Sequence, residues 1–180
     1  GLLTLGDAGT PALFIGASIL VSVSFAPILL SATPAPSLEV AQPMGLRELF
    51  AGSPLGTVGI FLLGSVYATQ SGMGAVFGTE IGMSADRIAL FVAMLFAGAL
   101  VLQYPIGWLS DRMDRRKLVF GAALLGAGAC ALGWSLGDAP GPLLLAAFLA
   151  GGVTTPLYAL LLAHTNDFLT ADEMPAASGG

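Results

Sequence analysis

Long apolar stretches separated by short polar segments make up most of the chain. Five of these stretches contain 20 or more residues without a charged side chain. About 20 apolar residues in a helix rising about 1.5 Å per residue cross the hydrocarbon core of a bilayer. The stretches do not alternate between apolar and polar residues, as the strands of a membrane barrel would. The pattern therefore predicts five spanning helices, at about residues 11–30, 54–79, 88–110, 118–137 and 141–166.

The composition supports a membrane protein. Only 9% of the residues are charged, whereas a soluble domain carries about 25% and needs them to cover its surface. The net charge of −5, without a basic stripe, excludes a nucleic-acid partner, because phosphate binding needs clustered Lys and Arg. The single cysteine, Cys130, excludes a disulfide framework and a cysteine-based metal site, and no pattern indicates a cofactor. We expect an all-α polytopic membrane protein.

The positive charges are unevenly distributed between the two sides of the membrane. Consecutive spans alternate in direction, so the connectors 31–53, 111–117 and 167–174 share one side. Five of the six Lys and Arg residues lie in these connectors, and only Arg87 lies on the other side. By the positive-inside bias, these three connectors face the cytoplasm.

The connectors predict three further features. The proline-rich segment Ser31–Pro43 has few charges, which is typical of a semi-rigid linker and marks a domain boundary. After it, Gly45–Phe50 predicts a short interfacial helix with its apolar residues toward lipid. Thr170–Glu173 has the spacing of a capping box and predicts a helix that begins near Met174. We expect the chain to be a fragment cut at both ends.

The connector after the third predicted span contains a motif. It reads Gly107-Trp108-Leu109-Ser110-Asp111-Arg112-Met113-Asp114-Arg115-Arg116. This segment resembles the loop motif of the major facilitator superfamily, G-x-L-x-D-R-x-G-R-R. It departs from that pattern at Asp114, where a glycine is usual.

The residue types of the motif have physical roles of their own. Gly107 permits close contact with another helix, and Asp111 can stabilise the positive end of a neighbouring helix. Arg112, Arg115 and Arg116 can fix the orientation in the membrane and bind lipid phosphate. We treat these five residues as a candidate gating motif. The alternative is a basic juxtamembrane anchor, which would need the positive charge but neither the aspartate nor the glycine.

The resemblance implies a domain order and a function. In that superfamily, two six-helix halves rock around a solute site near the bilayer midplane. Residues 1–30 then correspond to the last helix of the N-terminal half, 31–53 to the cytoplasmic linker and 54–180 to most of the C-terminal bundle. The implied function is secondary transport of a small solute by alternating access. Membrane lipid and the N-terminal half of the same chain are the implied partners.

A second resemblance concerns the last predicted span. Pro156–Tyr158 and Ala163–Asp167 are similar to the corresponding segments of the YcaD-type branch of bacterial facilitators. This similarity implies a multi-pass protein of the bacterial inner membrane.

Two predicted spans contain polar residues near their centres, at helical spacing. These residues are Tyr67, Gln70 and Ser71 on the second span and Thr154, Thr155 and Tyr158 on the fifth. Polar groups at this depth face protein or a wet cavity, because lipid offers no hydrogen-bond partner. We take the six as candidates for lining a solute cavity, and their uncharged chemistry suits a neutral or amphipathic solute. Interhelical packing is the alternative.

The sequence leaves two other function classes as alternatives. A Ser71–His164 dyad would indicate an intramembrane protease, but these residues lie about 20 Å apart in depth at 1.5 Å per residue, whereas a base must approach within about 3.2 Å. A membrane scaffold without transport would not need polar groups at mid-depth in two helices. His164 is also a candidate proton relay, or else a helix-end residue bonded to Asn166 or to a backbone carbonyl. It lacks the partners of a metal site.

The uneven charges predict the topology of the intact protein. In a variant without Cys130, single cysteines at Ser84 and Asp138 should react with an impermeant thiol reagent added outside the cell. A cysteine at Met113 should not react, because the positive-inside bias places it in the cytoplasm. Labelling of position 113 in sealed cells would contradict this orientation.

Overall fold

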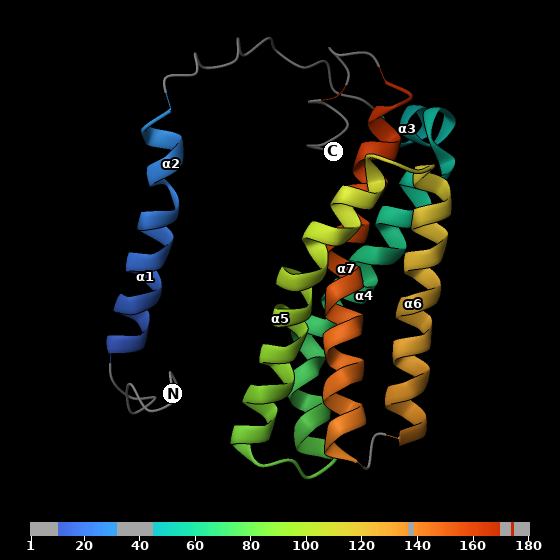
Figure 1. Cartoon of the computed structure of the whole chain (residues 1–180). Helices are drawn as coiled ribbons and strands as arrows, with labels where there is room; N and C mark the ends of the chain where they lie inside the picture. Colours follow the sequence, from blue (N-terminus) through green and yellow to red (C-terminus); the bar gives the residue numbers. More distant parts are fainter. Residues whose placement is uncertain (1–10, 32–44, 137–138, 170–173, 175–180) are drawn as a thin grey trace. The chain divides into compact units, whose positions relative to one another are not determined.

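The computed structural model describes residues 11–31, 45–136, 139–169 and 174. Across these ranges the regular structure is helical and contains no strand, which confirms the all-α prediction. The chain divides into two compact units, residues 1–39 and 40–180, and each is described by itself (Figure 1). The predicted linker at 32–44 and the predicted capping box at 170–173 lie outside the described residues.

The first unit contains helix α1 (Ala12–Ser24) and the one-turn helix α2 (Ala26–Leu29). This differs from the single continuous span predicted at 11–30. Pro27 explains the difference, because it has no N–H to donate to Val23 and its ring crowds that carbonyl. The chain tightens at Phe25, whose N–H bonds to the carbonyl of Ser22 at 3.3 Å.

The described residues of the second unit form five helices. They are α3 (Leu46–Gly52), α4 (Pro54–Glu80), α5 (Ala85–Ser110), α6 (Arg115–Leu136) and α7 (Pro140–Asn166). Among the described residues, α4 to α7 are the four helices long and apolar enough to cross a membrane, which confirms four of the five predicted spans. The short helix predicted after the linker is α3, and its Leu46 and Phe50 are exposed.

Local sequence signals set both ends of α4. The hydroxyl of Ser53 accepts a hydrogen bond from the N–H of Gly56 at 3.3 Å and so caps the first turn. The helix ends before Gly82, whose φ of 72° lies in the left-handed region that favours glycine. There the N–H of Met83 bonds back to the carbonyl of Gly78 at 2.9 Å. The tight turn lets α5 return alongside α4.

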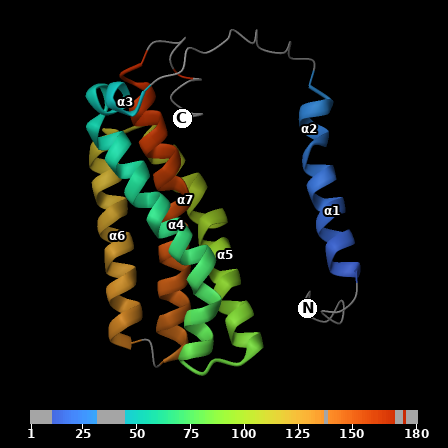
Figure 2. The same ribbon diagram turned by 180° about the vertical axis from the view of Figure 1, so that it is seen from behind.

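Helix α7 lies at the centre of the second unit, between α5 and α6 and against α4 (Figures 1 and 2). Half of its most apolar stretch is buried, whereas only 6% of that of α4 is buried. Helix α3, the α5–α6 turn and the end of α7 lie together at one end of the unit, which we call the inner end. The charge bias of the sequence predicts that this end faces the cytoplasm.

Helices α5 and α7 approach each other closely because glycines occupy their contact positions. A Cβ at Gly98 of α5 would collide with the carbonyl oxygen of Phe148. A Cβ at Gly151 of α7 would lie 2.6 Å from the carbonyl carbon of Leu95, and one at Gly152 would lie 2.9 Å from the carbonyl oxygen of Gly98. The two helices therefore pack backbone against backbone, as small residues allow between membrane helices.

Helix α4 packs against α7 toward the inner end. A Cβ at Gly59 would lie 2.7 Å from the side chain of Leu161, and one at Gly56 would collide with the hydroxyl of Thr165. A buried apolar cluster next to this contact joins α4, α6 and α7, and it consists of Leu63, Leu118, Val119, Leu160 and Leu161. Between membrane helices such packing contributes through van der Waals contact, because lipid is as apolar as the side chains.

The close α5–α7 contact predicts that Gly98→Leu destabilises the bundle by about 3 kcal/mol, because the new side chain would need the space of the α7 backbone. The matched control is Gly128→Ala in α6, where a Cβ meets no described atom within 4 Å. The control should raise stability by about 0.4–1 kcal/mol through loss of unfolded-state freedom. Denaturant unfolding of the full-length protein in micelles measures both. Equal stability of Gly98→Leu and wild type would contradict the packing.

Candidate functional site

Four of the six predicted cavity residues meet at one level between α4 and α7. The hydroxyl of Tyr67 donates to Thr155 Oγ1 at 3.1 Å, and Gln70 Nε2 donates to Thr154 Oγ1 at 3.0 Å. Tyr67 is the middle residue of α4, and the two threonines lie within two residues of the middle of α7. The structure thus brings these four residues together near the middle of both helices.

The hydrogen bonds of this level continue into the backbone of α7. Thr154 is buried, and its hydroxyl donates to the carbonyl of Ala150 at 2.7 Å. Tyr67 and Gln70 are half-buried, and Tyr67 also packs against the apolar cluster of α4, α6 and α7. These hydrogen bonds therefore join α4 to α7, while the side chains of Tyr67 and Gln70 stay partly accessible.

Ser71 and Tyr158 are not part of this level. Both are exposed, and neither makes a side-chain hydrogen bond to another residue in the described part of the chain. Tyr158 is 43% exposed on the surface of the second unit. Their predicted role in a cavity depends on what covers that surface in the whole protein, so it stays a prediction.

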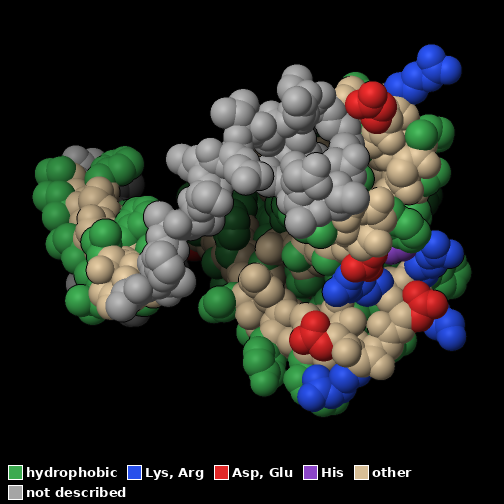
Figure 3. Space-filling view, turned by 90° about the horizontal axis from the view of Figure 1, so that it is seen from above, with side chains coloured by type: hydrophobic (Ala, Val, Ile, Leu, Met, Phe, Trp, Pro, Cys, Tyr) green, Lys and Arg blue, Asp and Glu red, His purple; other side chains and the backbone are tan. Residues whose placement is uncertain are grey.

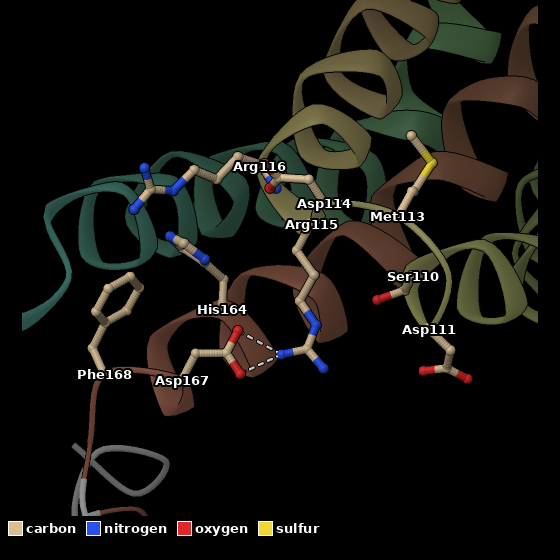
Figure 4. Close-up of a pocket in the computed structure, with 9 residues that line it drawn as sticks. All are labelled: Ser110, Asp111, Met113, Asp114, Arg115, Arg116, His164, Asp167 and Phe168. Atoms are coloured by element: carbon tan, nitrogen blue, oxygen red, sulfur yellow. Dashed lines mark hydrogen bonds and ion pairs between the residues drawn. The ribbon is translucent and has the colours of Figure 1, made fainter.

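The inner end forms a second polar region, where charged side chains gather (Figure 3). A shallow hollow of about 480 Å³ lies between the α5–α6 turn and the end of α7 (Figure 4). It is lined by Ser110, Asp111, Met113, Asp114, Arg115, Arg116, His164, Asp167 and Phe168. Three of the five predicted motif residues, Asp111, Arg115 and Arg116, line this hollow.

Arg115 connects the motif to α7. Its Nη1 forms an ion pair with both carboxylate oxygens of Asp167 and also donates to the carbonyl of Ala163 at 3.4 Å. Asp167 caps the end of α7, so the pair ties the first residue of α6 to the last turn of α7. The sequence pattern did not predict Asp167 as the partner of Arg115. Its position directly after an apolar stretch, opposite a cluster of arginines, was the available signal.

Asp114 directly precedes α6, at the position where the family motif has a glycine. Its Oδ1 accepts a hydrogen bond from the N–H of Arg116 at 2.9 Å, which satisfies a free donor of the first turn. The backbone there is not left-handed, because Gly82 is the one described residue with positive φ. The turn is thus stabilised by the capping side chain of Asp114, and it does not need the left-handed backbone that a glycine would allow. It also explains why α6 begins at Arg115, ahead of the predicted 118.

The other motif residues make few contacts with the described helices. Arg112 lies over the ring of Trp108, with its guanidinium carbon 3.9 Å from the ring centroid, and donates to the Trp108 carbonyl at 3.1 Å. Asp111 is exposed and has no ion pair or hydrogen bond from its side chain within the described residues. A Cβ at Gly107 would meet no described atom within 4 Å, so the expected close helix contact is not made by these helices.

His164 is buried at the inner end of α7 and packs edge-on against Phe168, with ring centroids 5.1 Å apart. Within the described residues its imidazole makes no hydrogen bond, so the expected side-chain bond to Asn166 or to a carbonyl is absent there. It also lies ten residues from Thr154, about 15 Å along the helix axis, whereas Ser71 is adjacent to Gln70 at the level of Thr154. The two residues of the hypothetical protease dyad therefore do not meet.

Comparisons with known proteins agree with this geometry. The sequence model described as Major Facilitator Superfamily matches residues 55–180, which contain all four spans of the second unit. The chain is similar to a protein named "Uncharacterized MFS-type transporter YfkF" from Bacillus subtilis (strain 168), with 27% identity over 120 residues. That alignment covers 66% of this chain but only 30% of the relative, so the chain spans a minor part of its length. No solved structure matches. Neither match tests the YcaD-type resemblance.

The Arg115–Asp167 pair predicts an energetic coupling between α6 and α7. Because the side chains are 32% and 49% exposed, we expect only about 0.3–1 kcal/mol in the free energy of unfolding, decreasing as salt is added. A double-mutant cycle with Arg115→Gln and Asp167→Asn in the full-length protein measures this term. Strict additivity of the two single changes would show that the pair does not couple the helices.

Proposed function

Because the chain belongs to the major facilitator superfamily, we propose that it forms much of the second half of a secondary transporter that moves a small solute by alternating access. The described helices are those of a multi-pass membrane transporter of this kind. We further propose that the protein acts on a small solute by alternating access and lies in the bacterial inner membrane.

The observation that carries the proposal is the mid-depth level of Tyr67, Gln70, Thr154 and Thr155. These groups link α4 to α7 at the middle of two spans, where lipid cannot satisfy them. The α5–α7 contact, in comparison, is made through glycines, with no side-chain hydrogen bond between those two helices among the described residues. Accessible amide and hydroxyl groups at this depth suit a site where a solute replaces part of its water shell.

The inner end supports the gating part of the proposal. Arg115 and Asp167 tie α6 and α7 into one body, whereas Asp111 projects from the end of α5 without a partner among the described residues (Figure 4). In a transporter with two rocking halves, such an unpaired carboxylate can bind a helix end or a cation of the other half in one state only. We propose this role for Asp111, with Arg112 beside it.

The four spans lack the charged residues that usually couple transport to an ion gradient. None of the four spans contains Asp, Glu, Lys or Arg at mid-depth, where such groups mark ion pathways. If transport is driven by protons, the titrating carboxylate belongs to the first half of the protein. His164, at the inner end, is the candidate that the second unit offers.

The gating role predicts that Asp111→Asn lowers transport by the full-length protein while expression and membrane insertion are unchanged. The loss should correspond to about 0.3–2 kcal/mol, the range of a charge at a helix end. Proteoliposomes with an imposed gradient, supplied with a solute whose accumulation the wild type changes, provide the measurement. Lys117→Gln, which neutralises an exposed charge on the next helix, is the control and should transport normally. Unchanged rate and affinity in Asp111→Asn would contradict the gate.

A further inference from the structure

We propose that the inner end of the second unit binds the phosphate of an anionic membrane lipid, held by Arg116 and His164 beside the ring of Phe168. We call these three residues the headgroup site. The sequence leaves Arg112, Arg115 and Arg116 as candidate contacts for lipid phosphate, and the structure distinguishes among them. The inference does not depend on the proposed transport function.

Arg116 is the arginine of the motif whose guanidinium remains available. Arg115 is paired with Asp167, and Arg112 lies over the ring of Trp108. The guanidinium of Arg116 makes no ion pair or hydrogen bond within the described residues. A guanidinium presents a planar set of donors that fits the oxygens of a phosphate in pairs. An anion at the inner end would therefore find free donors at Arg116.

His164 is an independent indication of a ligand. Its side chain is 5% exposed and lines the hollow, yet the imidazole has no hydrogen-bond partner within the described residues. Its ring nitrogens are still accessible, because Asn166 Oδ1 is the one described polar side-chain atom that is fully buried without a partner. An imidazole carries at least one N–H in either protonation state, and leaving a desolvated donor unpaired is costly. A ligand in the hollow that accepts a hydrogen bond would satisfy it.

The two donors lie at the same side of the hollow, around Phe168. The ring centroid of Phe168 lies 5.1 Å from that of His164 and 5.9 Å from the guanidinium carbon of Arg116. Figure 4 shows these three side chains together, with Asp111 at the opposite side of the hollow. One anionic group beside Phe168 would therefore have both donors near it.

The charges of the inner end favour an anion. Residues 111–117 together with Asp167 carry four cations and three carboxylates. Two of these carboxylates already have partners, because Asp167 is paired with Arg115 and Asp114 accepts from the N–H of Arg116 at 2.9 Å. Basic pockets between helices at the membrane surface bind lipid headgroups. A headgroup with net negative charge fits this end better than one that brings a cation next to Arg116.

The surface next to Arg116 distinguishes a lipid from a soluble phosphate. Arg116 begins a row at four-residue spacing on α6, and the row continues with Phe120 and Leu124. Phe120 is 67% exposed and Leu124 is 56% exposed. An acyl chain can lie along this apolar row while the phosphate stays at the helix end, where the span leaves the hydrocarbon core. A soluble phosphate would leave the row uncovered.

The first experiment tests the site by photocrosslinking. The full-length protein is placed in phosphatidylcholine nanodiscs with a trace of phosphatidylglycerol that carries a photoreactive group on its acyl chain, near the glycerol. Illumination in about 0.5 M salt screens the attraction between exposed charges. We expect crosslinks, mapped by mass spectrometry, in the peptides that contain Phe120 and Phe168. Their absence in the wild type would overturn the inference.

Variants assign these crosslinks to the two donors. Arg116→Gln should lower their yield about tenfold, through loss of charge-assisted hydrogen bonds. His164→Phe keeps a ring against Phe168 but removes the N–H, and should lower the yield about two- to tenfold. Lys117→Gln removes an exposed cation from the same turn and, in salt, should stay within about twofold of the wild type. An unchanged yield in Arg116→Gln or His164→Phe, or an equal loss in Lys117→Gln, would overturn the site.

Competition tests the class of ligand. Unlabelled phosphatidylglycerol should displace the photoreactive lipid, whereas phosphatidylethanolamine should need about a fivefold higher fraction, because it adds a positive charge. Soluble glycerol phosphate should not compete, because it has no chain to cover the apolar row. Equal competition by phosphatidylethanolamine would overturn the preference for an anionic lipid. Displacement by glycerol phosphate would identify a soluble anion as the ligand and would overturn the lipid.

Discussion

The second unit depends on the close approach of α7 to α5. Lipid provides no hydrophobic force between helices, so contact must come from surfaces that fit closely. Gly98, Gly151 and Gly152 let the two backbones meet where any side chain would collide. This contact holds α7 at the centre of the unit, and one turn toward the inner end Thr154 and Thr155 reach Tyr67 and Gln70 of α4. The position of the polar level thus follows from the glycines that precede it.

The two polar regions of the unit differ in chemistry because they differ in depth. At the inner end, water and lipid headgroups can solvate charges, so arginines and aspartates form an exposed ion pair, a helix cap and a cation–π contact. At mid-depth, the four residues are uncharged and donate to one another or to the backbone. In the proposed function, the charged groups set orientation and gating, and the neutral groups contact the solute.

The sequence predicted what depends on length and depth, and it missed what depends on rotation about a helix axis. Four spans and the shared level of Tyr67 and Thr155 followed from counting residues at a fixed rise. The rotation of α7 against its neighbours decides which side Tyr158 faces. It also decides that Asp167 lies within reach of Arg115. The glycine contacts set this rotation. The break at Phe25 could have been predicted, because Pro27 lies inside the predicted span. It was missed because the apolar stretch continues through this position without a charged residue.

The most direct test of the account is whether the α4–α7 level faces a wet cavity or lipid. Single cysteines at Gln70 and at Phe61, both on α4 in a full-length protein without Cys130, can be treated in membranes with a small charged methanethiosulfonate. Phe61 is 76% exposed and apolar, so it serves as the lipid-facing reference. We expect the cysteine at position 70 to react much faster than the one at position 61. Thiolates form only where water is present, and the charged reagent reaches only those positions. Equally slow reaction at both positions would contradict a solute cavity at this level.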